Sequence, residues 1–370
     1  MKIGILTLQY GTNYGGTLQC YALYKTLSAL GHEVEVINFI PAIVAPVYKR
    51  LLYNLSMCRS FQDISNFLKR LRKPKNCKQP NNKLIEAFGL FRTEHMRMTE
   101  VVDENSIAGL NGRYDAIVVG SDQVWSSMVR SHLTYFGEWY PKFCGKLVSY
   151  AACSYTDKYP LVRKRKLKAL VNRFSAISVR DNMTRSLISR FYDSQVSLVA
   201  DPTFLYDFSL FVTSPLINEP YIFLYVLGSD IEGGNDIAVS MLKEKLSVGK
   251  VVAVTSDNTD IPYADITYKE MSPEGWVNLI ANASCVFTDS FHGAVFSLKF
   301  KRRFVAYYSD FTRTSRLIDL QNKFCLNKNI ISQRRQLEHL SASDMEVPGS
   351  VCESMAHLKH ESEKFLINNL

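Results

Sequence analysis

Residues 283–297 read Ala-Ser-Cys-Val-Phe-Thr-Asp-Ser-Phe-His-Gly-Ala-Val-Phe-Ser, an apolar run that breaks into a polar turn and then resumes. The pattern predicts a buried strand over residues 284–287, a turn over 288–290 and the opening of a helix over 293–300. A turn between a strand and a helix lies at the carboxyl edge of a parallel sheet, where open α/β folds bind ligands. The stretch therefore predicts an α/β fold with a ligand site at this edge.

His292 directly follows this turn. It would lie beside the free backbone N–H groups and the positive dipole of the expected helix, which together favour an anion. An imidazole titrates near neutral pH, so His292 is a candidate for proton transfer. The alternative is a helix-capping turn in which the histidine is only structural. This stretch alone leaves both interpretations open.

The composition is that of a globular protein with two domains. The chain has 370 residues, of which 46% are hydrophobic and 21% are charged, enough for two separate cores. The apolar run at residues 1–8 is too short for a signal peptide, and no run has the length of a transmembrane helix. Eight cysteines without a CxxC pair are typical of reduced thiols. We therefore expect a cytoplasmic protein, and no cluster has the spacing of metal ligands.

The net charge of +9 is concentrated in one segment. Residues 47–78 contain nine basic residues and one acid, Asp63, a net charge of +8. Since the rest of the chain is nearly balanced, we do not expect a nucleic-acid-binding protein. Apolar residues recur with the spacing of one helix face at Met57, Phe61, Ile64, Leu68 and Leu71. Such a basic amphipathic helix either contacts an anionic membrane or packs as an ordinary surface helix.

Strands and helices alternate along the chain in two successive series, each of which predicts a parallel sheet covered by helices. The first series begins with a strand at residues 2–8 and the second begins at residue 221. We accordingly predict an N-terminal domain over residues 1–205, with residues 47–78 as an insertion, a C-terminal domain over 206–350 and a C-terminal helix over 351–370.

Three further polar groups follow predicted strands of the first series. The loop of residues 9–16 contains Asn13, Gly15 and Gly16, Asp122 follows a second strand, and Arg180 follows a third. All of them should lie at the ligand-binding edge of the sheet. The glycine spacing differs from that of the dinucleotide fingerprint, so the loop predicts a tight turn with a moderate signal for a ligand.

Trp125 lies close to Asp122 and is a candidate stacking face for a sugar. In the alternative interpretation, Trp125 belongs to the core and Asp122 only caps the following turn.

Taken together, the motifs of the chain resemble those of the polysaccharide pyruvyl transferase family over most of its length. The matching segments, in the order found in that family, are residues 13–23, 120–125, 149–152, 178–181, 201–203, 288–293 and 316–320. The resemblance implies two Rossmann-like domains that face each other across a cleft, similar to GT-B glycosyltransferases. It also implies transfer of the enolpyruvyl carbons of phosphoenolpyruvate to two hydroxyls of a sugar, giving a cyclic pyruvate ketal and phosphate without a cofactor.

The resemblance also implies roles for particular residues. His292 would transfer the proton, and Arg180 and Arg316 would bind the anionic donor, because guanidinium pairs bidentately with carboxylate or phosphate. Ser290 and Gly293 would complete the donor side. The alternatives are an ion pair of Arg180 with Asp181 or another neighbour, and a solvated helix face for Arg316.

The acceptor would lie on the N-terminal domain, near Asn13, Gly15, Gly16 and Asp122. One position departs from a pattern of the family, because Ser290 stands where an arginine is expected. Lys299 or Arg313 could replace that missing cation.

The implied partner is a sugar of a cell-surface polysaccharide precursor, such as an exopolysaccharide or a capsule. If that acceptor is linked to a lipid diphosphate, the basic segment 47–78 would bring the enzyme to the inner face of the membrane. Two other functions stay open: a GT-B-type glycosyltransferase that uses a nucleotide sugar, and a non-catalytic carbohydrate-binding protein.

Overall fold

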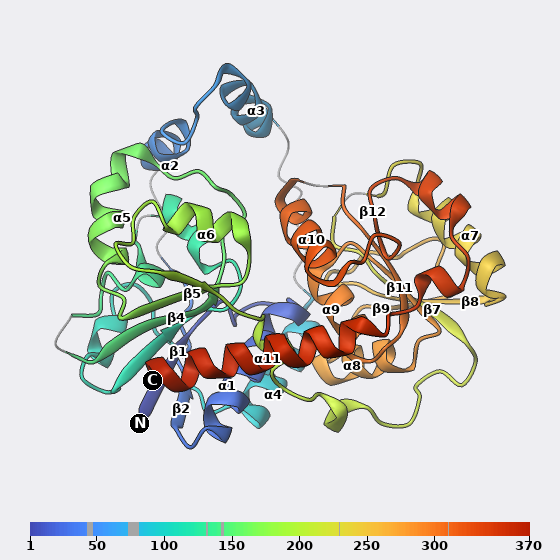
Figure 1. The fold of residues 1–370 in the computed structure, drawn as a ribbon, viewed down its shortest axis with the longest axis horizontal. Coiled ribbons are helices and arrows are strands. Elements are labelled where there is room, and N and C mark those ends of the chain that lie inside the picture. Colours follow the sequence, from blue (N-terminus) through green and yellow to red (C-terminus); the bar gives the residue numbers. More distant parts are fainter. Residues whose placement is uncertain (43–46, 73–80, 131, 142–143, 229, 310) are drawn as a thin grey trace.

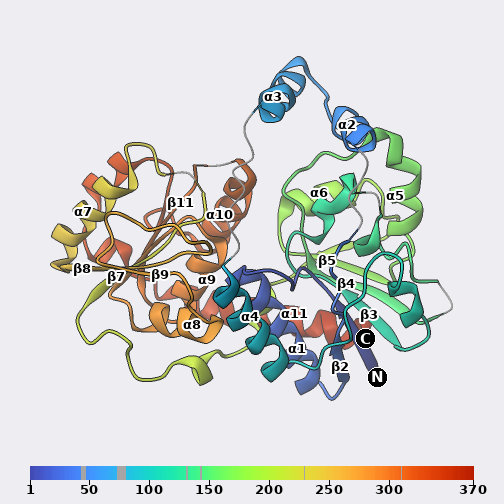
Figure 2. The ribbon, with the colours of Figure 1, turned by 180° about the vertical axis from the view of Figure 1, so that it is seen from behind.

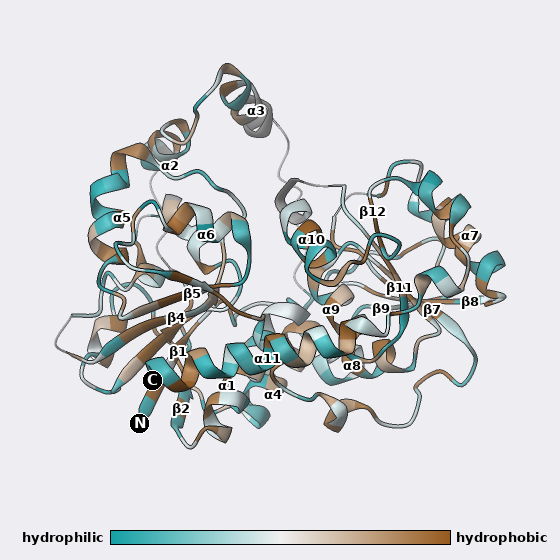
Figure 3. Cartoon of the chain, viewed as in Figure 1, coloured by the Kyte–Doolittle hydropathy of each residue, from teal (hydrophilic) through white to brown (hydrophobic). Residues whose placement is uncertain are grey.

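Two α/β domains lie side by side in the computed structural model (Figure 1), and each is built on a parallel six-stranded sheet. The structure describes residues 1–42, 47–72, 81–130, 132–141, 144–228, 230–309 and 311–370. Most strands of both sheets are largely apolar (Figure 3), as expected of parallel strands that helices cover. The predicted α/β fold is thus confirmed, whereas the predicted domain limits stay a prediction.

The N-terminal sheet has the order β2-β1-β3-β4-β5-β6. Its strands are β1 (Lys2–Leu6), β2 (Glu33–Val36), β3 (Ala116–Val119), β4 (Lys146–Ala152), β5 (Ala176–Val179) and β6 (Val196–Leu198). Its helices are α1 (Tyr14–Ala29), α4 (Asn82–His95), α5 (Lys164–Val171) and α6 (Asn182–Ile188). Because all of these strands are parallel, their carboxyl ends meet at one edge of the sheet.

The C-terminal sheet has the order β12-β11-β10-β7-β8-β9. Its strands are β7 (Tyr221–Tyr225), β8 (Lys250–Val254), β9 (Ile266–Tyr268), β10 (Cys285–Thr288), β11 (Arg303–Tyr307) and β12 (Ile330–Ile331). Its helices are α7 (Asn235–Leu246), α8 (Pro273–Asn282), α9 (Phe291–Lys299) and α10 (Phe311–Phe324). The sequence did not predict the short edge strands β9 and β12, because two or three residues carry too little periodicity.

Helix α1 holds the two domains together. Its first residue, Tyr14, is fully buried and stacks on Trp276 of α8 with ring centroids 5.4 Å apart. The Tyr14 hydroxyl also donates to the carbonyl oxygen of Met271 at 2.7 Å. An apolar core therefore continues from the first domain into the second, which fixes the two facing sheet edges relative to each other.

The last helix, α11 (Ser350–Asn369), begins at the C-terminal domain and returns to the N-terminal domain, where both chain ends lie (Figures 1 and 2). The Ser362 hydroxyl accepts a hydrogen bond from the Ala200 amide at 2.8 Å. The Lys146 ammonium donates to the terminal Leu370 carbonyl at 3.1 Å. Helix α11 thus forms a second connection between the domains.

The basic segment forms two helices, α2 (Val47–Leu55) and α3 (Phe61–Arg72). The amphipathic helix predicted from Met57 to Leu71 is confirmed over the residues of α3, but the inclusion of Met57 was wrong. The physical reason is that a separate helix, α3, starts after a cap at Ser60. The Asp63 amide donates to the Ser60 hydroxyl at 3.2 Å, and the Asp63 carboxylate accepts from the Ser60 amide at 3.1 Å, a reciprocal capping arrangement. Both helices project beyond the two sheets (Figures 1 and 2). Residues 73–78 of the predicted insertion lie outside the described residues.

Within the part of the chain that the structure describes, no helix combines the length and the apolar character needed to span a bilayer.

Candidate functional site

Four neighbouring strands of the N-terminal sheet place polar side chains at one edge. Asp122 follows β3, Cys153 follows β4, Arg180 follows β5 and Asp201 follows β6. The backbone at Asp122 is left-handed, with φ of 68°, a conformation that aspartate tolerates better than most residues. The carboxyl edge of this sheet is thus a continuous row of polar groups, as the strand-ending rule predicts.

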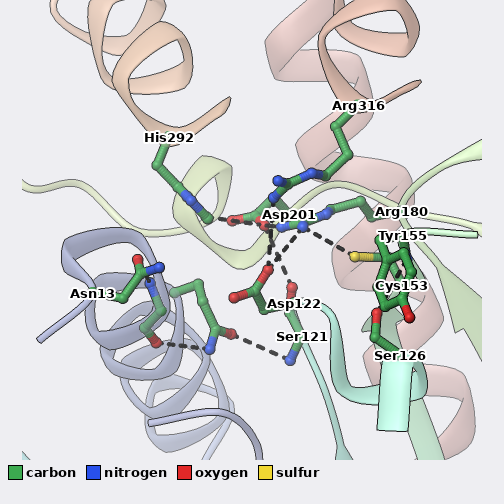
Figure 4. Close-up of polar contacts among 12 residues, drawn as sticks. Asn13, Ser121, Asp122, Ser126, Cys153, Tyr155, Arg180, Asp201, His292 and Arg316 are labelled. Atoms are coloured by element: carbon green, nitrogen blue, oxygen red, sulfur yellow. Dashed lines mark hydrogen bonds and ion pairs between the residues drawn. The ribbon is translucent and has the colours of Figure 1, made fainter. Parts of the chain in front are cut away.

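Arg180 is the centre of this row (Figure 4). One terminal nitrogen, Nη1, donates to Asp201 Oδ2. The other, Nη2, donates to Asp122 Oδ1 at 3.0 Å and to Cys153 Sγ at 3.0 Å. Because Arg180 is only 3% exposed, these contacts hold its charge inside the protein. The structure favours the ion-pair interpretation, with partners other than Asp181, and the role of Arg180 as an anion clamp stays a prediction.

The ion pairs keep the side chains of Asp122, Asp201 and Arg180 charged inside the protein. Burial raises the pKa of Asp122, but the charges of Arg180 and His292 outweigh it and leave that pKa below its ordinary value. Burial likewise raises the pKa of Asp201, yet His292 and Arg180 lower it well below its usual range. Burial lowers the pKa of Arg180, whereas its negative neighbours raise it well above the ordinary value. Two buried carboxylates therefore share the single guanidinium of Arg180, and the three groups together carry one net negative charge.

His292 lies in the first turn of α9, which begins at Phe291, two residues before the predicted start, and follows β10 after a short turn. Its Nε2 is 3.6 Å from Asp201 Oδ2 of the other domain (Figure 4), beyond hydrogen-bond distance, and it has no hydrogen-bond partner among the described residues. The opposite ring atom, Nδ1, packs against Gly15, where an added Cβ would lie 2.0 Å away. The imidazole is only 5% exposed. It is therefore positioned between a carboxylate and a glycine of the N-terminal domain.

The other predicted residues of the N-terminal loop have mainly structural contacts. The Asn13 side-chain oxygen accepts from the Gly16 amide at 3.0 Å and caps α1. A Cβ on Gly16 would lie 3.1 Å from the Leu8 carbonyl oxygen. Gly15 and Gly16 thus permit close packing, while Asn13 also faces a cavity. The role of these residues in acceptor binding stays a prediction.

A polar cavity of about 200 Å³ lies between the two sheet edges. Its walls include Asn13, Asp122 and Gln123 from the N-terminal domain, and Asp289, His292 and Arg316 from the C-terminal domain. Arg316 comes from α10, and its Nη1 lies 4.0 Å from Asp122 Oδ1. The structure thus brings together five predicted residues from both domains. Asn13 and Asp122 belong to the expected acceptor side, and Ser290, His292 and Arg316 to the expected donor side. A cavity of this size suits a small ligand, because drug-sized ligands occupy roughly 300 to 1,000 Å³.

The predicted donor residues around His292 shape the start of α9. The Ser290 hydroxyl accepts from the Gly293 amide at 3.3 Å and caps the helix. Gly293 is buried, and a Cβ there would lie 2.6 Å from the Thr288 hydroxyl. Ser290 and Phe291 both contribute to the cavity wall. The N-terminus of α9, with its positive dipole, therefore faces the cavity.

Lys299 cannot replace the cation that is missing at Ser290. It lies at the opposite end of α9, a separation of roughly 12 Å along the helix, and its ammonium donates to the Tyr206 carbonyl at 2.8 Å. Burial lowers its pKa to about 8. That hypothesis was wrong because the helix axis points Lys299 away from the cavity. The side chain of the other candidate, Arg313, lies outside the described residues.

Trp125, the predicted stacking face for a sugar, does not line the site. Trp125 is fully buried, donates from Nε1 to the Tyr135 carbonyl at 3.1 Å and stacks on Phe136. It is therefore a core residue and offers no face to a sugar.

Asp201 is a central residue that the prediction missed, although it follows a strand in the same way as Arg180 does.

A group with the spacing of metal ligands lies elsewhere. Among the described residues, Glu94, His95 and Glu274 each place a ligand atom within 4.8 Å of the others. None of the three contributes to the cavity wall. The residues that do line the cavity pair carboxylates with cations, an arrangement suited to binding an anion and transferring protons.

Comparisons with known proteins agree with this description. A family model described as Polysaccharide pyruvyl transferase matches residues 13–310, and no curated protein matches the chain. Among solved structures, one described as a UDP-N-acetylglucosamine 2-epimerase from Listeria monocytogenes has a TM-score of 0.55 at 11% identity, over 99% of this chain and 94% of that one. UGT89C1 from Arabidopsis thaliana has a TM-score of 0.50 at 10% identity, over 98% and 94%. These likenesses show the fold alone, which is GT-B-like.

Proposed function

This chain belongs to the polysaccharide pyruvyl transferase family, and we propose that it forms a cyclic pyruvate ketal on a sugar of a cell-surface polysaccharide precursor, with phosphoenolpyruvate as the donor. The observation that carries the proposal is the interdomain cavity, where His292 and Arg316 meet the N-terminus of α9 opposite Asp122. Phosphoenolpyruvate offers a carboxylate and a phosphate, which guanidinium groups and helix N-termini bind. The reaction has no need of a further cofactor.

The chemistry assigned to the cavity has two steps. In the first, protonated His292 gives its proton to the methylene carbon of phosphoenolpyruvate, while a sugar hydroxyl oxygen bonds to the adjacent carbon and loses its own proton to the now neutral imidazole. In the second, a neighbouring hydroxyl oxygen bonds to the same carbon, the bond to the phosphate oxygen breaks, and the hydroxyl proton leaves with phosphate. Asp201, 3.6 Å from His292 Nε2, stabilises the imidazolium that donates in the first step.

Binding of the donor should depend on Arg316. We expect millimolar phosphoenolpyruvate to raise the melting temperature of the wild type, because a ligand of the folded state stabilises it. Arg316→Gln should weaken that binding by about 10- to 100-fold, since hydrogen bonds to charged groups contribute about 1.5–3 kcal/mol. Thermal shift titrations measure both effects.

The control for this titration is Arg335→Gln, which removes an exposed cation of the C-terminal domain and should bind phosphoenolpyruvate as the wild type does. UDP-N-acetylglucosamine tests the competing function. Stabilisation by this nucleotide sugar and none by phosphoenolpyruvate would favour a glycosyltransferase and contradict the proposal.

We also propose a cytoplasmic location with peripheral contact at the inner membrane face, where an acceptor linked to a lipid diphosphate would be found. Helices α2 and α3 support this proposal because they expose large apolar side chains: Tyr48 is 67% exposed, Leu52 50% and Phe61 93%. The same segment carries the net charge of +8 over residues 47–78. Exposed apolar groups beside basic ones are typical of surfaces that bind anionic lipid.

Co-sedimentation with vesicles tests the membrane contact. The wild type should bind vesicles that contain phosphatidylserine at low salt and bind neutral phosphatidylcholine vesicles less, because each basic residue near the surface adds about 1 kcal/mol. Phe61→Ser and the quadruple change of Lys69, Arg70, Arg72 and Lys73 to alanine should each reduce binding several-fold. Leu161→Ser, which alters an exposed leucine outside this segment, is the control. Equal binding by all variants would refute the contact.

A further inference from the structure

A second cavity adjoins the first. It has a volume of about 500 Å³ and is bounded by residues 10–13, by the start of α4 and by the loops that follow β7 and β8. Asn13 and Leu227 line both cavities. A ligand in the second cavity would therefore reach the edge of the site that contains His292.

The two cavities differ in charge. The first is lined by the guanidinium of Arg316 and by His292, together with the carboxylates of Asp122 and Asp289, whereas Asp257 is the charged residue among the described residues that line the second. The nearby guanidinium of Arg92 donates from Nη1 to the carbonyl oxygens of Gln9 and Gly11, at 3.2 Å and 3.1 Å. Its hydrogen bonds thus stabilise the loop behind the cavity wall. A phosphate group in the second cavity would meet an acid and no lining cation, which disfavours a nucleotide diphosphate.

The walls of the second cavity suit a sugar ring. Tyr10, Thr12 and Asn13 contribute hydroxyl and amide groups, which can donate to and accept from sugar hydroxyls. Ile85 of α4, which is 47% exposed, contributes an apolar surface on which the C–H face of a pyranose can pack. A volume near 500 Å³ falls within the range of pockets that bind ligands of drug size, so it accommodates more than the small donor.

We propose that the second cavity binds the acceptor as a neutral mono- or disaccharide, and that a linked diphosphate stays outside it. This inference rests on the proposed function, since it assigns the donor to the cavity with His292 and Arg316. The sugar hydroxyls that react would project past Asn13 and Leu227 toward His292. The N-terminal loop and α4 would then determine which sugar is accepted.

The proposal is tested by a substitution that places a larger side chain in the wall of the second cavity. Ile85→Trp places a large ring at a half-exposed residue of the cavity wall. Leu90→Trp, on the same helix and equally exposed, lies outside the wall and is the matched control. Saturation-transfer NMR would measure binding of four probes: methyl β-galactoside, methyl β-glucoside, methyl α-mannoside and methyl N-acetyl-β-glucosaminide.

At least one probe should bind to the wild type and to Leu90→Trp. The Ile85→Trp variant should bind that probe at least tenfold more weakly. Phosphoenolpyruvate should stabilise Ile85→Trp against heat as much as it stabilises the wild type. No binding of any probe to the wild type, equal binding by Ile85→Trp, or displacement of the probe by UDP alone would overturn the inference. Failure of phosphoenolpyruvate to stabilise the wild type would instead count against the proposed function, so the two failures are distinguishable.

Discussion

Replacing His292 with alanine is expected to lower the turnover of phosphoenolpyruvate-dependent phosphate release by about 10²-fold or more, the usual contribution of a general acid–base group. The reason is positional. The imidazole lies between Gly15 and Asp201, in the wall of a cavity that also contains Arg316. No other described residue of that wall is a histidine.

The control for this variant is His357→Ala, which changes an exposed histidine on α11 and should leave turnover unchanged. Denaturant unfolding of His292→Ala shows that the protein is still folded when activity is measured. Wild-type turnover in a folded His292→Ala protein would contradict catalysis by this residue and favour the non-catalytic carbohydrate-binding alternative.

Replacing Arg180 with methionine should destabilise the protein by about 3–5 kcal/mol, because removal of one partner leaves uncompensated buried charges. Asp201 and Asp122 would both lose the guanidinium that they contact. Arg185→Met removes an exposed cation of the neighbouring helix α6 and should change the unfolding free energy by no more than about 0.5 kcal/mol. Urea unfolding measures both values, and equal stability of the two variants would refute a structural role for the buried pairs.

The loss in Arg180→Met should shrink on acidification. In the wild type, the pKa values of Asp122 and Asp201 lie below the ordinary value, so these carboxylates stabilise the fold above about pH 4 and lose that effect as the pH falls through their folded-state pKa values. Without the guanidinium, burial should raise both pKa values, and the folded variant would take up protons at higher pH. The difference in unfolding free energy should therefore be smaller at about pH 5 than at about pH 7, and a constant difference would contradict this explanation.

Much of the site could be predicted because one geometric rule places it. His292, Arg180 and Asp122 each follow a strand, and parallel strands bring their carboxyl ends to a common edge. The rule applies equally to Asp201 after β6. Its position after a strand could not by itself separate a site residue from a structural one, since its Oδ1 also accepts from the Thr203 amide at 3.0 Å.

The sequence could not show which polar groups bind each other. The pairing of Arg180 with Asp122 and Asp201 depends on the order β3-β4-β5-β6 in the sheet, and strand order is a tertiary property. The same holds for Gly15, whose lack of a side chain is explained by the imidazole of a residue from the other domain.

Local patterns also failed where distant residues decide the outcome. Trp125 stands in a polar turn, yet Phe136 and Phe174 pack around its ring and bury it. Met57 was the first residue of the expected helix face, but the cap at Ser60 starts α3 at Phe61 and leaves Met57 outside it. Burial and capping therefore overrode periodicity at these two positions.

The most direct test of the account follows the methylene carbon of phosphoenolpyruvate. Purified protein is incubated in D₂O with phosphoenolpyruvate and the glycoside that binds the second cavity, and NMR follows phosphate and the product methyl group. Phosphate should be released only when the glycoside is present, and the ketal methyl group should carry one deuterium taken from the solvent through His292. Phosphate release that is independent of the glycoside, or a product whose methylene group persists, would contradict the proposed reaction.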